Sequence, residues 1–515
     1  MLVKTFGSAV YGVEAILIIV EVNVTEGLHT FIVGLPDNAV KESVQRVESA
    51  IKTNGFYMPR TKLIVNLAPA GIRKSGAAFD LPIALGVLAA TNQIPGATQL
   101  KDYVIMGELG LDGSIHSIKG ALPIAIQAQK DRFKGLILPR QNAREAAIVN
   151  GLPVFSFSHI REVIEFFQRG CVDAPDGPVN VLSTGSIADL CSVSEEPDFA
   201  DVKGQELIKR SLEIAAAGGH NVLLIGAPGA GKTMLARRLP GILPSLSMQE
   251  ALETTRIHSV AGKLPEHSAL ITRRPFRSPH HTISGHALVG GGSIPQPGEI
   301  SLAHNGVLFL DELPEFSRSV LEVMRQPMED GRVTVSRAKM SVEFPATFML
   351  LAAMNPCPCG YYNHPDKECN CLPGAVQKYL NKISGPLLDR IDLHVEVVPV
   401  PYAHLSSASP GESSFVIRGR VLAAREYQCH RYKKNITNAR MTPAMLKEFC
   451  RIDPAGEKLM KDAMNRLHLS ARAYDRILKV ARTIADLAGE KDIKPTHLAE
   501  AIQYRCLDRE SWGQM

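Results

Sequence analysis

The chain has 515 residues, and its 45% apolar and 21% charged composition is typical of a soluble globular protein with roughly two to four domains. Its longest apolar runs are too short to cross a bilayer and its first residues do not form a signal peptide, so we expect a cytoplasmic protein without a membrane partner. A net charge of +5 indicates no particular partner, and nine mostly scattered cysteines fit a reducing compartment better than a disulfide framework.

Residues 1–171 combine strand and helix patterns. Short β-branched runs predict strands over residues 16–24, 30–33 and 63–66. Apolar residues at helical spacing predict a helix over residues 38–54, with Asp37 or Asn38 as its N-cap. The mixture predicts an α+β domain.

Three stretches of this region carry a family resemblance: GLPDNAVKESVQRVESAI at 34–51, VNLAPAGIRKSGAAFDLPIALGVLAA at 65–90 and GELGLDGSI at 107–115. They resemble the N-terminal domain of the ComM/YifB family of magnesium-chelatase-like AAA+ ATPases. The resemblance implies an S5/Lon-protease-like fold for residues 1–171. The Asp-, Pro-, Ser- and Gly-rich composition of residues 172–199 predicts a linker.

A Lon-like fold raises the alternative of a Ser-Lys peptidase. Ser75 lies near the place where the resemblance puts the nucleophile, and residues 106–129 mirror the segment that carries the catalytic lysine. Leu122 occupies the lysine position, and Lys119 is nearby but out of register. Because a serine nucleophile needs a base within hydrogen-bond reach, we expect a domain for assembly or substrate gating instead of proteolysis.

The stretch NVLLIGAPGAGKT at residues 221–233 predicts a nucleotide-binding loop. Its short apolar run predicts a buried parallel strand, and the following G-x-x-x-x-G-K-T pattern opens a helix. In such a loop the backbone N–H groups face a polyphosphate, the lysine reaches the β- and γ-phosphates, and the threonine hydroxyl binds Mg²⁺. The predicted ATP-binding residues are Gly226, Ala227, Pro228, Gly229, Ala230, Gly231, Lys232 and Thr233.

A second apolar run, VLFLDEL at residues 307–313, ends in an acidic pair. Open α/β sheets bind ligands at the carboxyl ends of their strands, so we expect this pair near the phosphate loop. Asp311 would hold Mg²⁺ together with Thr233, and Glu312 would activate the attacking water as a general base. The pair and the loop together predict a P-loop ATPase core of the α/β class over residues 200–400.

The AAA+ resemblance assigns two further catalytic residues in this core. The apolar run TFMLLAA at 347–353 leads to Asn355, which matches the sensor-1 position beside the γ-phosphate. The stretch ISGPLLDRIDLHVEV at 383–397 resembles the segment that carries an arginine finger, and Arg390 is the matching residue. A finger stabilises the phosphoryl group bound by a neighbouring subunit, so the resemblance implies a homo-oligomeric, hexameric ring. The plain alternative is a surface ion pair of Arg390 with Asp389 or Asp392.

Residues 401–515 are expected to form a C-terminal helical lid. Helices are predicted over residues 414–434, 454–467 and 471–487, and another begins at Thr496. The stretch LSARAYDRILKVARTIADL at 469–487 resembles the family's sensor-2 helix. Arg472 corresponds best to the sensor-2 arginine, and Arg476 is the alternative.

Two segments of the core predict contact with DNA. Residues 273–306 combine a basic entry with a Gly-rich tip and indicate a projecting hairpin, the helix-2 insert. Residues 328–346 alternate apolar and polar side chains around a short basic tip and resemble the pre-sensor-1 hairpin of MCM-like motors. Basic side chains at a hairpin tip can contact the DNA phosphates without recognising the base sequence. Any single basic tip can also be a solvated turn. The predicted DNA-binding residues are Arg332, Arg337 and Lys339.

Four cysteines are concentrated in residues 357–371, directly after Asn355. Cys357 and Cys359 form one C-x-C pair, and Cys369 and Cys371 form another. Four thiolates satisfy tetrahedral zinc, and a closed site of this kind is structural. His364 is an alternative ligand, and free thiols are the alternative to a metal site.

The sequence therefore predicts an ATP- and Mg²⁺-dependent motor that forms a ring and acts on DNA. In the ComM relatives this means helicase or branch-migration activity in homologous recombination during natural transformation. The alternatives are a subunit of a metal-chelatase complex and a protein-remodelling ATPase. A D-x-S-x-S metal site, expected of a chelatase's integrin-like partner, has no counterpart in this sequence.

Overall fold

The structure is a computed structural model that describes residues 1–94, 98–171, 177, 179, 197–265, 268–292, 295–337, 340–362, 364, 367–372, 374–399, 411–467 and 469–505. It divides into two compact units. Unit 1 comprises Met1–Ser192, Met248–Thr272 and Pro295–Pro297, and unit 2 comprises Val193–Ser247, Arg273–Ile294 and Gly298–Met515. Most of the predicted linker, residues 172–199, lies outside the described residues. Within the described ranges, no helix is both long enough and apolar enough to cross a membrane.

Unit 1 is built on a mixed sheet with the strand order β3-β4-β2-β1-β5-β8-β9. Its strands are β1 (Leu2–Tyr11), β2 (Glu14–Thr25), β3 (Thr30–Val33), β4 (Lys62–Ala68), β5 (Tyr103–Ile105), β8 (Gly135–Pro139) and β9 (Val154–Phe157). β2 pairs antiparallel with both β1 and β4, whereas β5, β8 and β9 pair in parallel. The structure thus confirms the three strands predicted from β-branched runs, and it adds the strands around them.

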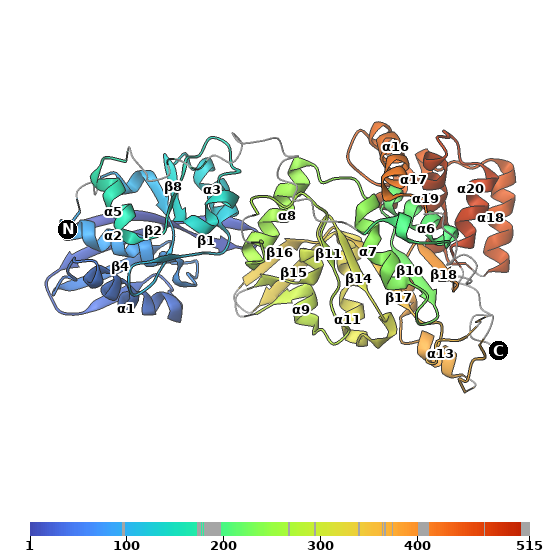
Figure 1. Cartoon of the computed structure of the whole chain (residues 1–515), viewed down its shortest axis with the longest axis horizontal. Coiled ribbons are helices and arrows are strands. Elements are labelled where there is room, and N and C mark those ends of the chain that lie inside the picture. The colour runs from blue at the N-terminus through green and yellow to red at the C-terminus, as the bar shows by residue number, and fades with distance from the viewer. Residues whose placement is uncertain are drawn as a thin grey trace. The chain divides into compact units, whose positions relative to one another are not determined.

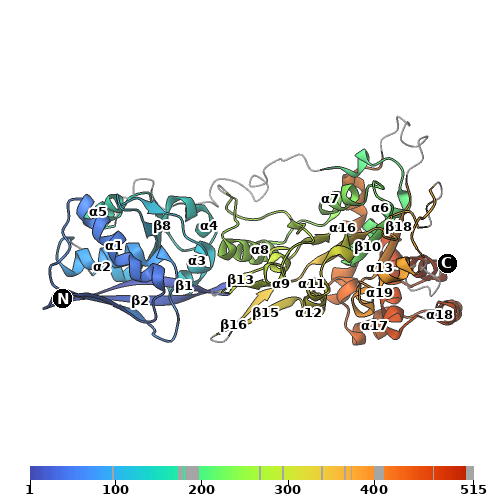
Figure 2. The ribbon, with the colours of Figure 1, turned by 90° about the horizontal axis from the view of Figure 1, so that it is seen from below.

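Helices cover this sheet and supply much of the core of unit 1. They include α1 (Asn38–Thr53), α2 (Asp80–Ala90), α3 (Ala121–Lys130) and α5 (Ile160–Gln168). The helix α8 (Met248–Ala261) also belongs to unit 1 and packs against α3. Figure 2 shows α1, α2 and α3 on the same side of β1 and β2. The predicted helix α1 is confirmed, with the Asp37 carboxylate accepting a hydrogen bond from the Val40 N–H at 2.9 Å as its N-cap. Although residues 248–272 lie within the predicted ATPase core, they cluster with unit 1.

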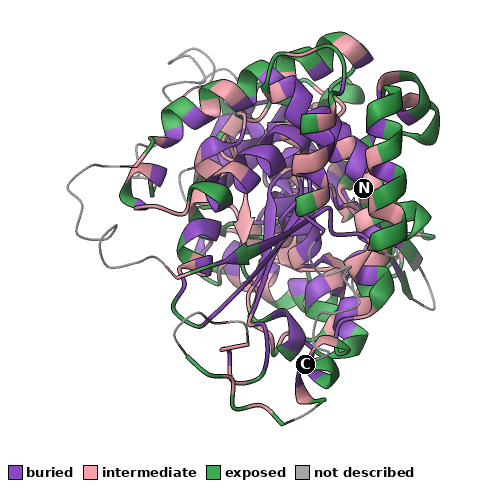
Figure 3. Ribbon diagram, turned by 90° about the vertical axis from the view of Figure 1, so that its right-hand side faces the viewer, coloured by how far each residue is buried: buried purple, intermediate pink, exposed green. Residues whose placement is uncertain are grey.

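Unit 2 contains a parallel sheet with the strand order β11-β14-β17-β10-β18. Its strands are β10 (Val222–Gly226), β11 (Phe276–Arg277), β14 (Val307–Leu310), β17 (Met349–Met354) and β18 (Leu393–Val397). All residues of β10, β14 and β17 are buried, which explains why these strands are continuous apolar runs. Figure 3 shows the buried strands in purple, with helices around them whose outer faces are exposed.

The predicted basic hairpin is present as β15 (Arg332–Arg337) and β16 (Met340–Pro345), which pair antiparallel. Val333 lies opposite Phe344 and Val335 opposite Val342, and all four side chains are buried. Alternate residues therefore share one apolar face, as the period of two predicts.

Helices complete unit 2 (Figure 1), and the C-terminal ones follow the predicted pattern closely. They are α6 (Glu206–Gly218), α7 (Lys232–Ile242), α9 (Gly285–Val289), α10 (Glu299–Leu302), α11 (Arg318–Val323), α12 (Arg325–Asp330), α13 (Ala375–Leu380), α14 (Gly385–Leu388), α16 (Ser414–Tyr432), α17 (Pro443–Phe449), α18 (Pro454–Arg466), α19 (Ala471–Leu487) and α20 (Pro495–Gln503). The predicted helices at 414–434, 454–467, 471–487 and from Thr496 are confirmed as α16, α18, α19 and α20. The short helix α17 was not predicted.

The first part of the segment 273–306, expected to be the basic entry to a projecting hairpin, lies in the core of unit 2. Phe276 and Arg277 form β11 at the edge of the core sheet, and the Phe276 ring stacks on Phe309 with centroids 5.9 Å apart. The Arg277 guanidinium donates to the Glu299 carboxylate at 2.6 and 2.9 Å. Because this aromatic and this cation contribute to packing within unit 2, the first part of the segment belongs to the core.

Candidate nucleotide-binding site and metal centre

The predicted ATPase residues lie at the carboxyl ends of three neighbouring strands. β10 leads into the phosphate loop, β14 leads to Asp311, and β17 leads to Asn355. Ile225 is in register with Met354, so the loop and Asn355 leave the sheet side by side. This is the edge at which open parallel sheets bind their ligands.

The phosphate loop has the conformation that its glycines predict. Gly229 and Gly231 have φ angles of +78° and +88°, in the left-handed region that glycine adopts without steric cost. Gly231 directly precedes α7, so the phosphate loop ends at the N-terminus of that helix. Both the loop and the helix dipole at this point favour a bound anion.

Lys232 is buried at the start of α7 and contacts both the loop and Asn355, the residue after β17. Its Nζ donates to the carbonyl oxygens of Gly226 at 2.6 Å and Ala227 at 2.9 Å, and to Asn355 Oδ1 at 3.1 Å. Burial lowers the pKa of Lys232, while the carboxylates of Asp311 and Glu312 oppose the shift. The predicted lysine and the predicted sensor-1 asparagine are therefore neighbours.

A second contact joins the loop to the acidic pair. Thr233 Oγ1 donates to Asp311 Oδ2 at 2.7 Å, so a hydroxyl and a carboxylate oxygen converge on one point. Asp311 Oδ1 accepts the Glu312 N–H at 3.0 Å. Hard oxygen donors in this arrangement fit Mg²⁺, which binds to proteins through few such ligands and through substrate phosphates.

Glu312 differs from Asp311 in conformation and exposure. Its φ angle of +53° is uncommon for a residue other than glycine, and backbone strain of this kind is concentrated at functional sites. The Glu312 side chain is 57% exposed, and its Oε2 lies 3.4 Å from His281 Nδ1. A cavity beside it is lined by Asn355 and by Lys378 and Tyr379 of α13. The general-base candidate is thus open to water, and it has a partner that sequence reasoning missed.

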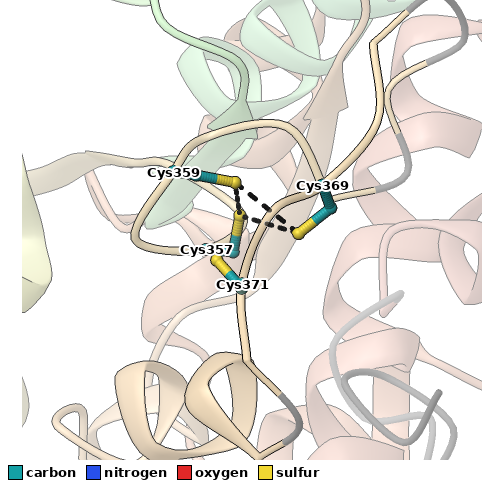
Figure 4. Close-up of side chains that lie close together, drawn as sticks. All are labelled: Cys357, Cys359, Cys369 and Cys371. Carbon is teal, nitrogen blue, oxygen red and sulfur yellow. Dashed lines mark hydrogen bonds between the residues drawn. The ribbon is translucent and has the colours of Figure 1, made fainter.

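The four cysteines of residues 357–371 form one cluster (Figure 4). Cys357 Sγ lies 3.2 Å from Cys359 Sγ and 3.8 Å from Cys369 Sγ, and all four sulfur atoms lie within 4.8 Å of one another. None of the four is in a disulfide. A zinc ion with Zn–S bonds of about 2.3 Å in a tetrahedron separates its sulfur ligands by about 3.8 Å. The donor set and its spacing therefore fit a tetrahedral metal ion.

Arg390, the arginine-finger candidate, is buried within the chain itself. It follows α14, and its guanidinium lies 2.5 Å from the Glu329 carboxylate and donates to the Pro386 carbonyl at 2.6 Å. Only 8% of its side chain is exposed, whereas 51% of Glu329 is exposed. In this conformation Arg390 is tied to α12.

The two sensor-2 candidates have different surroundings on α19. Arg472 is exposed in the first turn of the helix. Arg476 donates to Asp392 Oδ1 at 2.8 Å, and Asp392 is only 1% exposed. Of the two, Arg476 is engaged in a contact between the lid helix and the core sheet, and Arg472 is oriented to solvent.

Comparison with known proteins places these features in a family. The chain matches the model of magnesium chelatase subunit ChlI over residues 198–405, that of subunit ChlI of Mg-chelatase over residues 20–142, and the ChlI C-terminal model over residues 411–505. The competence protein ComM of Haemophilus influenzae is 44% identical over 510 residues, which cover 98% of this chain and 97% of that protein. The chain belongs to the ComM/YifB family.

Two further relatives show the range of this similarity. The uncharacterized protein YifB of Escherichia coli is 44% identical over 505 residues, 97% of this chain and 96% of its own length. The magnesium-chelatase 38 kDa subunit of Rhodobacter capsulatus is 26% identical over 254 residues, 44% of this chain and 68% of that protein. This member of the ComM/YifB family is thus similar over nearly its whole length to ComM and YifB, and over less than half of it to that chelatase subunit.

The predicted DNA-binding residues of this family member are only partly described. Arg332 lies at the base of the hairpin opposite Pro345, is exposed, and is 3.3 Å from the Glu343 carboxylate. Arg337 is the last residue of β15, at the hairpin tip. Its side chain and the whole of Lys339 lie outside the described residues.

The N-terminal peptidase candidates show no lysine placed for catalysis. Leu122 is fully buried in α3, and Lys119 is exposed before that helix. The residue before Ser75 is Lys74, which is buried with its ammonium group on the Pro69 carbonyl. Burial lowers the pKa of Lys74. The lysine beside the serine is therefore part of the local packing.

Proposed function

We propose that the chain is an ATP-hydrolysing motor that forms a hexameric ring and moves on DNA, as a helicase or branch-migration enzyme. The observation that carries the proposal is the convergence of Thr233 and Asp311, 2.7 Å apart, with Lys232 and Asn355, 3.1 Å apart, at the end of one parallel sheet. In this arrangement one end of a triphosphate lies on the loop and the other faces an acidic pair and a polar side chain.

Each residue has a distinct role in the proposed hydrolysis. Lys232 binds the β- and γ-phosphates, and Asn355 orients the water beside the γ-phosphate. Glu312 accepts the proton of that water, for which its exposure beside the cavity is suited. Thr233 and Asp311 would hold Mg²⁺, which when bound neutralises charge on the phosphate oxygens.

The cysteine cluster supports a structural metal ion in the same unit. Cys357, Cys359, Cys369 and Cys371 would supply all four ligands of Zn²⁺, which leaves no position for a substrate. Such an ion holds together two chain segments that contain little regular structure. Its proposed contribution is therefore to the shape of the segment after β17.

DNA as the substrate and a ring as the assembly are supported by three features. The hairpin of β15 and β16 carries Arg337 at its tip, where a cation can contact the phosphate backbone. Arg390 matches the arginine-finger position and would complete a neighbouring subunit's site once its guanidinium leaves Glu329. The relative from Haemophilus influenzae is named a competence protein, which supports a role in natural transformation. Homologous recombination in the cytoplasm is part of the same proposal.

A chelatase-type or protein-remodelling ATPase is the second candidate. The similarity to the magnesium-chelatase 38 kDa subunit favours it, but covers only 44% of this chain. The two candidates share the ATP site and differ in what stimulates it. DNA distinguishes them because only the motor responds to it.

The decisive experiment measures ATP turnover by the full chain with and without single-stranded and branched DNA. We expect DNA to bind and to increase turnover several-fold. Glu312→Gln should lower turnover by about 10²–10⁴-fold while ATP still binds, since only the proton acceptor is removed. If turnover occurs but DNA neither binds nor stimulates it, the motor proposal fails and the remodelling candidate replaces it. Unchanged turnover in Glu312→Gln would remove the assignment of the general base.

A further inference from the structure

The cysteine cluster and the phosphate loop meet at Gly360. This residue is buried, has a φ angle of +83°, and follows Cys359 directly. A Cβ atom at Gly360 would lie 2.5 Å from Cδ and 2.7 Å from Cγ of Pro228, the third residue of the phosphate loop. Real Cβ atoms do not approach carbon this closely, so only glycine allows the two loops to touch in this way.

The turn that carries Gly360 is held by the first cysteine pair. The Gly360 N–H donates to the Cys357 carbonyl at 3.0 Å, and the Tyr362 N–H donates to Cys357 Sγ at 3.4 Å. Cys357 is fully buried. A cavity next to Ala227 is lined by Gly360 and Tyr362, which places the same turn along the first part of the phosphate loop.

The segment also reaches the other end of the phosphate loop. Asn355, two residues before Cys357, accepts the hydrogen bond of Lys232 at 3.1 Å. Residues 355–360 therefore contact both Pro228 at the tip and Lys232 at the end of the loop. Whatever fixes this segment also fixes the position of the groups proposed to bind the triphosphate.

We propose that the four-cysteine cluster is a metal-dependent support of the phosphate loop, so that metal loading raises the affinity of the chain for a nucleoside triphosphate. This inference rests on the proposed ATP site. One metal ion joins Cys357 and Cys359 to Cys369 and Cys371 and thereby fixes the two cysteine pairs relative to each other. The turn from Cys357 to Gly360 then stays in contact with Pro228. The phosphate loop therefore loses less conformational freedom when nucleotide binds.

The test measures metal content and nucleotide affinity, and uses neither DNA nor turnover. Metal is measured by elemental mass spectrometry, and affinity by titration with a fluorescent ATP analogue. Chelator-treated wild-type chain should bind the analogue about tenfold more weakly, and added Zn²⁺ should restore the affinity. The double variant Cys369→Ser with Cys371→Ser should lose the metal and about tenfold in affinity, with no recovery on adding Zn²⁺.

Two glycine variants separate the contact from the metal. Gly360→Ala should keep the metal and still lose affinity, because its methyl group displaces Pro228. Gly374→Ala is the matched control: its φ angle of +76° imposes similar backbone strain, but nothing lies within 4 Å of the added Cβ. It should keep both metal and affinity.

Each result decides a different statement. Full nucleotide affinity in metal-free wild-type chain would overturn the coupling, as would wild-type chain that takes up no metal. Normal affinity in Gly360→Ala, or an equal loss in Gly374→Ala, would show that the contact with Pro228 does not transmit the effect. Wild-type chain that binds no nucleotide with metal present would instead remove the proposed ATP site itself, and a lack of response to DNA leaves the coupling intact.

Discussion

His281 Nδ1 lies 3.4 Å from the carboxylate of Glu312, the proposed general base. His281 comes from the segment that follows β11, and its ring also contacts Phe316 edge-on at a centroid distance of 6.4 Å. A carboxylate held beside a histidine in this way is turned toward that partner and away from a bound water. Glu312 must therefore leave His281 before it accepts a proton from water.

We expect His281→Ala to increase ATP turnover in the absence of DNA. An exposed pair of this kind is worth about 0.2–1 kcal/mol, so the increase should reach up to about fivefold, with nucleotide affinity unchanged. Steady-state turnover and analogue titration measure the two quantities. His286→Ala is the control, since His286 is an exposed histidine on α9 of the same segment. Lower turnover in His281→Ala would mean that the histidine positions the base productively.

Local patterns were sufficient to predict the elements that hold the site. The helix α1, the strand β10 and the lid helix α19 each have a continuous apolar pattern, and their ends carry recognisable residues such as the Gly-Lys-Thr of the phosphate loop. The short helix α17 has only seven residues, too few to show a helical period. Prediction therefore succeeded where the signal lies within one stretch of chain.

Contacts between distant stretches could not be predicted in this way. Nothing around Arg390 in the sequence indicates Glu329, and nothing around Gly360 indicates Pro228. The segment 273–306 has the composition of a loop, yet Phe276 joins the core sheet because a strand edge and Phe309 are available to it. These relationships depend on tertiary structure, which outweighs local composition.

The role of Arg390 can be tested by mixing subunits. If Arg390 completes a neighbouring site, Lys232→Ala and Arg390→Ala subunits are each inactive alone but complement one another in mixed rings. An equimolar mixture should recover about a quarter of wild-type turnover, because an intact Lys232 meets an intact Arg390 at that fraction of interfaces. A mixture with no recovery, formed from variants that assemble normally, would leave Arg390 as the structural partner of Glu329.

We expect substitutions at the tip of the β15–β16 hairpin to weaken DNA binding, and a substitution at its base to leave binding near normal. The double variant Arg337→Ala with Lys339→Ala should bind all DNA sequences more weakly. The slope of the logarithm of its binding constant against the logarithm of salt concentration should fall by the amount that about two phosphate contacts contribute. Arg332→Ala is the matched control, because this arginine lies at the hairpin base and pairs with Glu343. Affinity measured by fluorescence anisotropy at several salt concentrations should be near normal for the control. An unchanged salt slope in the double variant would exclude the hairpin tip from the DNA site.

Asp392 joins the core sheet to the lid helix. Its carboxylate accepts hydrogen bonds from Arg476 at 2.8 Å and from the Asn221 N–H at 3.0 Å, and it lies 3.3 Å from His220 Nδ1. Burial alone would raise the pKa of Asp392, but Arg476 and the hydrogen bonds lower it well below its usual value. A carboxyl group with a depressed pKa in the folded state stabilises the fold wherever it is ionised.

We expect Asp392→Asn to destabilise the chain by about 3 kcal/mol at pH 8, because Arg476 loses its buried counter-charge. The difference from wild type should stay constant above about pH 5 and shrink as the pH falls below about 4, toward the folded-state pKa. Urea denaturation followed by circular dichroism at pH 8 and at about pH 3 measures both effects. Asp475→Asn, an exposed carboxylate on the same lid helix, is the control and should change stability little at either pH. A loss in Asp392→Asn that is the same at both pH values would show that the shape of the side chain, and not its charge, holds the lid to the sheet.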